Sequence, residues 1–314
     1  MTDPLRRRVR AKFLRALTSS TALLPPSAVR LALAPFGSLA RFSKLEQRAR
    51  DNLRIAYGDE LDLRGRKRIA AGARHHAREL VEHWLRLARS QAPEDGPGGD
   101  WIEDYVDVDP SVERIDRELA KGRGAIVVTA HLGDWELLCA RLRRRGYAGA
   151  VIGLKKLNDP VADWLLDMRK AYGVTTLAQD SSPREVLRVL QAGGTVGMLC
   201  DLEVRRLAGE FVPFFGRSAL TMTAPAALAR AHRVPLIPVR CVKPPGSSRY
   251  LLSVDEPLEM DRSLDRKAAS IELMTKVNAH FESWIRETPE QWAWHQARWR
   301  TLPGEIEATP LHAR

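Results

Sequence analysis

From residue 124 onward, short apolar runs alternate with segments of helical periodicity, and this alternation constrains the fold more than any other feature of the chain. Strands separated by helices are typical of α/β proteins, in which helices cover both faces of a sheet. We therefore predict an α/β domain with a mixed sheet flanked by helices. The predicted strands are residues 125–130, 149–154, 195–200, 234–240 and 250–254, and the predicted helices are residues 134–144, 160–171, 183–192, 221–232 and 264–286.

The region before the first strand is predicted to be helical. Residues 45–92 carry apolar side chains at three- and four-residue spacing, and a loop rich in Pro, Gly and acids follows. His75, His76 and His83 lie in this helix, where a metal would need further ligands, so we expect solvated or core-edge histidines. We place the main domain at residues 45–300 and expect a loose tail over residues 301–314.

The first fifty residues hold most of the positive charge of the chain. They contain eleven Lys and Arg against two acids, within a total net charge of +11. Residues 13–42 are apolar but interrupted by prolines and arginines, and no window reaches the ~20 apolar residues of a spanning helix. We therefore interpret residues 1–44 as a basic amphipathic helical segment that binds an anionic membrane surface, with a soluble helical cap as the alternative. No zinc-finger, RNP or helix-turn-helix signature favours nucleic acid.

The chain contains three cysteines, none at the spacing of a zinc site. An odd number without such spacing indicates a reducing compartment and no disulfide framework. We expect no metal and no organic cofactor. No Ser or Cys stands in a G-x-S-x-G elbow, so catalysis through a covalent intermediate on such a nucleophile is not favoured.

The stretch AIVVTAHLGDWELL, residues 125–138, places His131 at the end of a predicted buried strand. Leu132 and Gly133 predict a turn, and Asp134 is a favoured N-cap for the helix that follows. Residues five apart on one helix face ~140° apart, but a histidine before the helix can meet a carboxylate in its first turn. We therefore expect Glu136 to bind one ring nitrogen of His131 and leave the other as a base.

Such a pair can activate a hydroxyl for attack on an acyl group, and a thioester suits because its thiol leaves readily. The helix N-terminus offers N–H groups for an oxyanion. The alternative is a structural histidine.

Five blocks of the sequence resemble one family in the right order. AHLGDWELL resembles the HxxxxD/E motif of glycerolipid acyltransferases, and the chain as a whole is similar to the late acyltransferases of lipid A biosynthesis. The blocks are RARDNLRIAYG (48–58), residues 153–174, GMLCDLEV (197–204), residues 211–230 and PEQWAWHQARWR (289–300).

The resemblance implies an acyltransferase at the cytoplasmic face of a bacterial inner membrane. It implies an acyl carrier protein thioester as donor and a lipid A precursor, a membrane glycolipid, as acceptor. It makes His131 and Glu136 the catalytic residues. The substrate-binding residues that it implies are Lys155, Lys156, Asn158, Arg169, Asp201, Arg217 and Thr221.

Several of these residues have alternative, purely structural roles. Lys155 stands near a position where many relatives carry arginine, and it lacks the planar fork of that residue. A contact to the oxyanion or a phosphate and a solvated lysine are equal alternatives for it. The resemblance implies that Asp201, at the end of a predicted strand, helps organise the site, and the alternative is a helix or turn cap. Two aromatic groups could either serve the lipid or pack in the core. They are Phe211, Phe214 and Phe215, as an acyl channel, and Trp284, Trp292, Trp294 and Trp299, as a membrane interface.

Three rival functions stay open. The first is acyl transfer to another glycolipid, such as a phosphatidylinositol mannoside or an aminolipid. The second is a thioesterase that uses water as acceptor, and the third is a non-catalytic lipid-binding protein of the same fold.

Overall fold

The computed structural model describes residues 43–88, 100–153, 159–179, 183–205 and 207–305. The expected membrane-binding segment lies outside them except for its last two residues. Within this part of the chain, no helix is long and apolar enough to cross a membrane.

A seven-stranded sheet forms the centre of the molecule, in the order β1-β9-β8-β2-β5-β3-β4. Only the β8–β9 pair is antiparallel, and the other neighbours run parallel. The α/β prediction is therefore confirmed. The strands are β1 (Val106–Val108), β2 (Ala125–Thr129), β3 (Gly149–Gly153), β4 (Thr175–Ala178), β5 (Thr195–Leu199), β8 (Leu236–Val242) and β9 (Tyr250–Val254).

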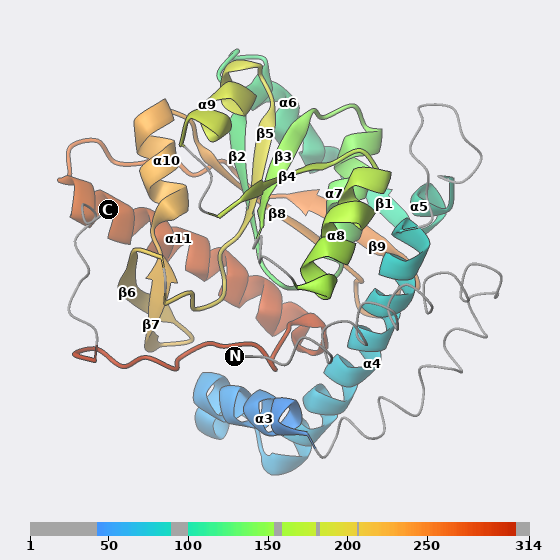
Figure 1. Ribbon diagram of the computed structural model, residues 1–314. Coiled ribbons are helices and arrows are strands. Elements are labelled where there is room, and N and C mark those ends of the chain that lie inside the picture. Colours follow the sequence, from blue (N-terminus) through green and yellow to red (C-terminus); the bar gives the residue numbers. More distant parts are fainter. Residues whose placement is uncertain (1–42, 89–99, 154–158, 180–182, 206, 306–314) are drawn as a thin grey trace.

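Helices cover both faces of the sheet (Figure 1), because strand residues alternate between two apolar cores. On β2, Ile126 and Val128 enter one core, and Ala125 and Val127 enter the other. The first core is closed by α3 (Lys44–Tyr57), α9 (Pro183–Gln191), α10 (Ala224–His232) and α11 (Arg266–Glu287). The second is closed by α5 (Asp100–Tyr105), α6 (Glu113–Leu119), α7 (Trp135–Arg144) and α8 (Pro160–Ala171).

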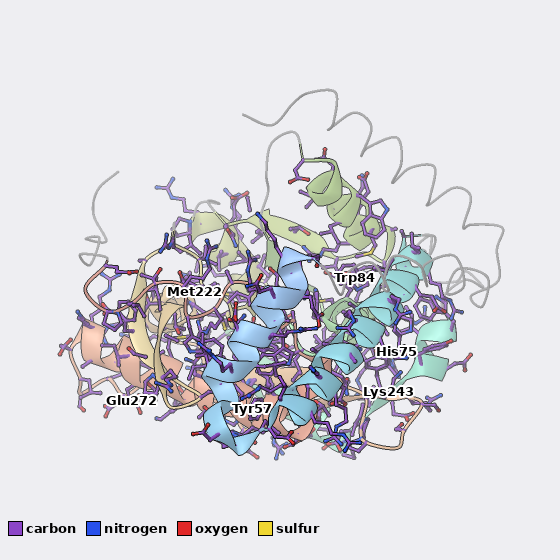
Figure 2. All side chains as sticks on the ribbon, turned by 90° about the horizontal axis from the view of Figure 1, so that it is seen from below. Tyr57, His75, Trp84, Met222, Lys243 and Glu272 are labelled. Carbon is purple, nitrogen blue, oxygen red and sulfur yellow. The ribbon has the colours of Figure 1, made fainter. Side chains whose placement is uncertain are left out.

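The single helix expected over residues 45–92 is two helices. Gly58, at a φ of 49°, ends α3, and a 3-10 turn (Gly58–Glu60) follows. Asp62 then caps α4 (Leu63–Leu87) by accepting a hydrogen bond from the Gly65 N–H. The two helices lie side by side across the face seen in Figure 2.

The expected helix over residues 221–232 begins later, at Ala224. Residues before it form an antiparallel hairpin of β6 (Gly209–Phe214) and β7 (Arg217–Met222), which packs on α11. Asn278 of α11 donates to the Pro213 carbonyl. Residues 244–248 form the expected turn between β8 and β9.

Thr301 is the first residue of the expected loose tail. This residue is fully buried, and its hydroxyl and N–H donate to the Glu203 carboxylate. A 3-10 turn η3 (Pro289–Gln291) precedes residues 292–300, which run along the carboxyl edge of the sheet. Residues 306–314 lie outside the described residues.

The turn between β2 and α7 is held from several sides. Gly133 donates to the Gln291 carbonyl, and Asp134 donates to the Cys241 carbonyl. The φ of Gly133 is 60°, in the region that disfavours a side chain, and a Cβ there would overlap the Cys241 carbonyl oxygen. The close approach of β8 therefore requires glycine.

We predict that Gly133→Ala lowers the free energy of unfolding by about 3 kcal/mol or more, because left-handed strain adds to a backbone clash. Gly122→Ala is the matched control, since its φ is 71° and nothing lies within 4 Å of the added Cβ. It should cost about 1 kcal/mol. Urea unfolding measures both, and equal losses would contradict the clash.

Candidate active site

His131 follows β2 at the carboxyl edge of the sheet, beside the end of β5. Its ring Nδ1 donates to Asp201 Oδ1 at 2.8 Å, and its backbone N–H donates to Asp201 Oδ2 at 2.9 Å. Its side chain is 23% exposed. Its Nε2 has no hydrogen-bond partner in the part of the chain that the structure describes. Because Asp201 fixes the tautomer, this second nitrogen can act as a base toward a molecule in the site.

Asp201 is fully buried, and three donors hold its carboxylate. Besides the two from His131, Trp292 Nε1 donates to Oδ2 at 2.8 Å. Burial alone raises the pKa of this carboxyl, but the charge of His131 and the three hydrogen bonds outweigh it and leave the pKa below its usual value. Asp201 therefore stays ionised against the imidazole.

The expected pairing of Glu136 with His131 is wrong. Glu136 lies in the first turn of α7 but faces α8, where Arg169 binds both of its oxygens at 2.6–3.2 Å. The Tyr172 hydroxyl donates to Glu136 Oε2 at 2.5 Å. The partner of His131 is instead Asp201, seventy residues away in the sequence, so a short-range motif could not indicate it.

The same ion pair accounts for Arg169, expected among the substrate-binding residues. Its side chain is 13% exposed, and its guanidinium is engaged bidentately by Glu136. Burial lowers the pKa of Arg169, but the charge and hydrogen bonds of Glu136 raise it above its ordinary value. Arg169 therefore joins α8 to α7 and is not available to a substrate in this structure.

Asp134 caps α7 as expected. Its Oδ1 accepts from the N–H groups of Glu136 and Leu137, and its Oδ2 accepts from His83 Nδ1 at 2.8 Å. Those two first-turn amides are therefore occupied, which removes them from the expected oxyanion site. His76 Nε2 donates to the Gly133 carbonyl at 3.1 Å.

His76 and His83 are thus core-edge residues that bind α4 to the turn after His131, and His75 is exposed on α4 (Figure 2). Among the described residues, no group of three or more His, Cys, Asp or Glu side chains could hold a metal ion.

Two further expected contacts differ in exposure. Arg217 is exposed at the start of β7. Thr221 is fully buried, and its hydroxyl accepts from Arg298 Nη2 at 3.0 Å, so it cannot meet a lipid headgroup. Lys155, Lys156 and Asn158 lie outside the described residues.

Arg298 is a buried cation that the sequence did not single out. It is 1% exposed, donates to the Leu220 carbonyl at 2.9 Å and lies 4.6 Å above the Phe214 ring. Burial lowers its pKa to about 10, opposed by the charges of Asp201 and Glu203. It ties the C-terminal block to the β6–β7 hairpin near Asp201. In the sequence, the position of Arg298 within the block PEQWAWHQARWR was the only sign that it has a role.

The C-terminal tryptophans belong to the core. The ring centroids of Trp292 and Trp294 lie 4.5 Å apart in an edge-to-face arrangement. Both rings are buried, as are those of Trp284 and Trp299. The core alternative is therefore confirmed for the four tryptophans, and their membrane-interface alternative is wrong. Phe214 and Phe215 are also buried and pack in the same core.

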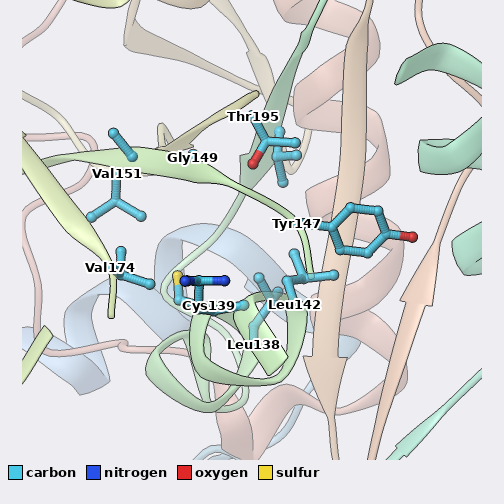
Figure 3. A pocket seen from close by; sticks show the side chains of 12 residues that line it. Leu138, Cys139, Leu142, Tyr147, Gly149, Val151, Val174 and Thr195 are labelled. Carbon is cyan, nitrogen blue, oxygen red and sulfur yellow. The ribbon is translucent and has the colours of Figure 1, made fainter. Parts of the chain in front are cut away.

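The three thiols are poor nucleophiles. Burial, followed by the charge of Glu136, raises the pKa of Cys139 to about 12, and burial raises those of Cys200 and Cys241. Cys139 borders a cavity of about 50 Å³ between α7 and the sheet (Figure 3). This cavity is about the size of a packing gap and lies on the α7 face of the sheet.

A larger apolar cavity of about 250 Å³ lies between α9, α10 and the carboxyl ends of β3, β4 and β5. Its lining reaches Leu199, two residues before Asp201. An aliphatic chain matches this lining. The lining includes Ile152, Ala178, Met198, Leu199, Met222, Ala227 and Leu228.

Known proteins resemble this chain over most of its length. A family model described as bacterial lipid A biosynthesis acyltransferase matches residues 10–301. A lipid A biosynthesis lauroyltransferase of Escherichia coli K12 is 29% identical over 197 residues, which is 61% of each chain. The chain therefore spans less than two thirds of that relative.

Two other relatives extend the comparison. A lipid A biosynthesis palmitoleoyltransferase of Escherichia coli K12 is 23% identical over 85% of this chain and 83% of its own length. A phosphatidylinositol mannoside acyltransferase of Mycobacterium tuberculosis is 22% identical over 65% of this chain and 63% of its own.

We predict that Asp201→Asn destabilises the protein by about 3 kcal/mol near pH 7, because it breaks a buried pair. Since the pKa of Asp201 is lowered by folding, this stability is present above the unfolded value of about 3.9 and is lost as pH falls through the folded value. The difference from wild type should therefore shrink below about pH 4. Urea unfolding across pH measures it, with exposed Asp51→Asn as control. A difference that grows toward low pH would contradict the ion pair.

Proposed function

Because the chain belongs to the bacterial lipid A biosynthesis acyltransferase family, we propose that it transfers a fatty acyl chain from an acyl carrier protein thioester to a hydroxyl of a membrane glycolipid. The first candidate acceptor is a lipid A precursor, in line with the names of two relatives. The observation that carries the proposal is the His131–Asp201 pair with an unbound Nε2.

In this mechanism His131 is the general base. Its Nε2 takes the proton of the acceptor hydroxyl as that oxygen attacks the thioester carbonyl carbon. The tetrahedral intermediate then collapses, the carbon–sulfur bond breaks, and the imidazolium returns its proton to the departing thiolate. The products are the glycolipid ester and free acyl carrier protein, and His131 is restored to its neutral form.

Asp201 acts through His131 and is a positioning residue. Its carboxylate keeps the proton on Nδ1 in the neutral ring and stabilises the imidazolium that forms during transfer. The backbone bond from His131 to the other carboxylate oxygen fixes the ring relative to β5. Glu136, although part of the recognised motif, supports the site by joining α7 to α8 through Arg169.

Direct transfer is favoured over an acyl-enzyme intermediate. The cysteine thiols stay protonated, as their raised pKa values require. The apolar cavity below the carboxyl ends of β3, β4 and β5 is the proposed place of the acyl chain. Lys155 is the proposed contact of the oxyanion or a substrate phosphate, and Arg217 that of a headgroup phosphate. Lys156 and Asn158 are further proposed substrate-binding residues.

The proposed place of the protein is the cytoplasmic face of the bacterial inner membrane. The basic residues of segment 1–44 would hold it on anionic lipid, and acyl carrier protein would bring the donor from the cytoplasm. Neither a metal nor an organic cofactor takes part in the proposed steps. Vesicle binding by the full chain, compared with a chain that lacks residues 1–42, tests the membrane role.

A second candidate acceptor is a phosphatidylinositol mannoside. The likeness to the mycobacterial acyltransferase of that lipid favours it specifically. Both acceptors present a hydroxyl on a membrane glycolipid, so the step at His131 is the same for each.

We predict that purified protein adds a single acyl chain to one of these acceptors, and that His131→Ala lowers the rate by about 100-fold or more. The assay supplies acyl carrier protein loaded with labelled chains of several lengths, and the product mass is read out. In the same assay, Ala227→Trp fills the apolar cavity and should favour shorter chains.

Transfer to phosphatidylinositol mannoside alone would keep the mechanism and change the substrate. Release of free fatty acid without an ester product would identify a thioesterase. A His131→Ala variant that transfers the acyl chain at the wild-type rate would refute the role of His131 as general base.

A further inference from the structure

A strap of residues 293–296 crosses the carboxyl edge of the sheet beside His131. At one side, the Ala293 N–H donates to the His131 carbonyl at 3.0 Å. At the other, Asn52 of α3 donates to the carbonyls of Trp294 and Gln296 at 2.8 and 2.9 Å. Arg48, one helical turn earlier on α3, donates from Nη1 to the His295 carbonyl at 3.3 Å. His131 and Arg48 therefore hold the same four residues.

Arg48 forms no ion pair within the described residues, and the bond to His295 is its only hydrogen bond there. It is half-buried on α3. Three buried carboxylates of the segments around it are engaged elsewhere. Glu46 binds Arg50 and Arg74, Asp201 binds His131, and Glu203 binds Thr301 and Arg205. Most of the donors of this guanidinium therefore have no acceptor among the described residues.

The ring of His295 also has no hydrogen-bond partner in the described part of the chain. It is half-buried. Burial lowers its pKa, and the charges of His131 and Arg48 lower it further. The strap therefore brings Arg48, His131 and His295 to the same edge of the sheet, where the Asp201 carboxylate is engaged by His131. An anion there would offset the repulsion among them.

We infer that Arg48 and His295 form a subsite, next to His131, that binds a phosphate group of a substrate. The planar fork of Arg48 matches two phosphate oxygens, and the His295 ring adds a donor. This inference rests on the proposed function. That function offers two sources of phosphate, the phosphodiester of the donor's pantetheine arm and a phosphate on the acceptor headgroup.

Steady-state kinetics with Arg48→Met tests the subsite. The donors are acyl-phosphopantetheine and acyl-pantetheine, and the acceptors are the same glycolipid with and without its phosphates. We expect Arg48→Met to raise KM about 10-fold or more for one phosphate-bearing substrate, with kcat within about 2-fold. The increase in KM should be absent with the matching substrate that lacks phosphate. The substrate, donor or acceptor, for which it is absent identifies the source of the phosphate.

Arg50→Met is the matched control, because Arg50 lies on the same helix but pairs with Glu46. It removes the same charge and should leave both KM values unchanged. His295→Asn should raise the same KM as Arg48→Met. Equal increases in KM for substrates with and without phosphate would overturn the proposal of a phosphate subsite.

A binding measurement separates this inference from the proposed function. Inorganic phosphate is titrated into the full chain while the histidine ring signals are followed by NMR. We expect phosphate to shift the His295 signals and raise its pKa in wild type, and to do neither in Arg48→Met. Wild type that binds phosphate here but transfers no acyl chain would refute the function alone. Absence of the shift in wild type would overturn the subsite.

Discussion

The fully buried carboxylate of Asp201 is the interaction on which the carboxyl edge of the sheet depends. A buried charge is tolerated only when donors surround it, and these come from two distant segments, the end of β2 and the C-terminal block. Trp292 Nε1 brings residues 289–300 across the edge, and the His131 ring is fixed as a consequence. One ion therefore sets both the orientation of the proposed base and the position of the strap beside it.

A second group of contacts keeps that centre in place from behind. His83 and His76 of α4 bind Asp134 and the Gly133 carbonyl, so the turn after His131 is held by a helix that contributes nothing to the pair itself. Glu136 and Arg169 join α7 to α8 in the same way. Of the motif residues, His131 meets the substrate in the proposed reaction. Gly133, Asp134 and Glu136 hold the turn and the helix that follow it.

The sequence predicted the features that depend on neighbouring residues. The strands β2, β5 and β9, the helix α8 and the Asp134 cap all follow from local apolar pattern and capping chemistry. The family resemblance is also confirmed, by the match over residues 10–301. The partner of His131, the burial of Thr221 and the role of Arg298 were missed, because each is decided by segments far apart in the chain. The helical pattern likewise failed at residues 221 and 222, the start of the helix predicted over 221–232, where pairing with β6 prevails.

The most direct test of this account compares Asp201→Asn with Glu136→Gln, using kcat for acyl transfer and the ¹⁵N signals that report the His131 tautomer. We expect Asp201→Asn to lower kcat about 100-fold or more and to change the tautomer, with KM within about 2-fold. Glu136→Gln should leave the tautomer as in wild type. A changed tautomer in Glu136→Gln, together with an unaltered one in Asp201→Asn, would contradict the pairing from which the mechanism is built.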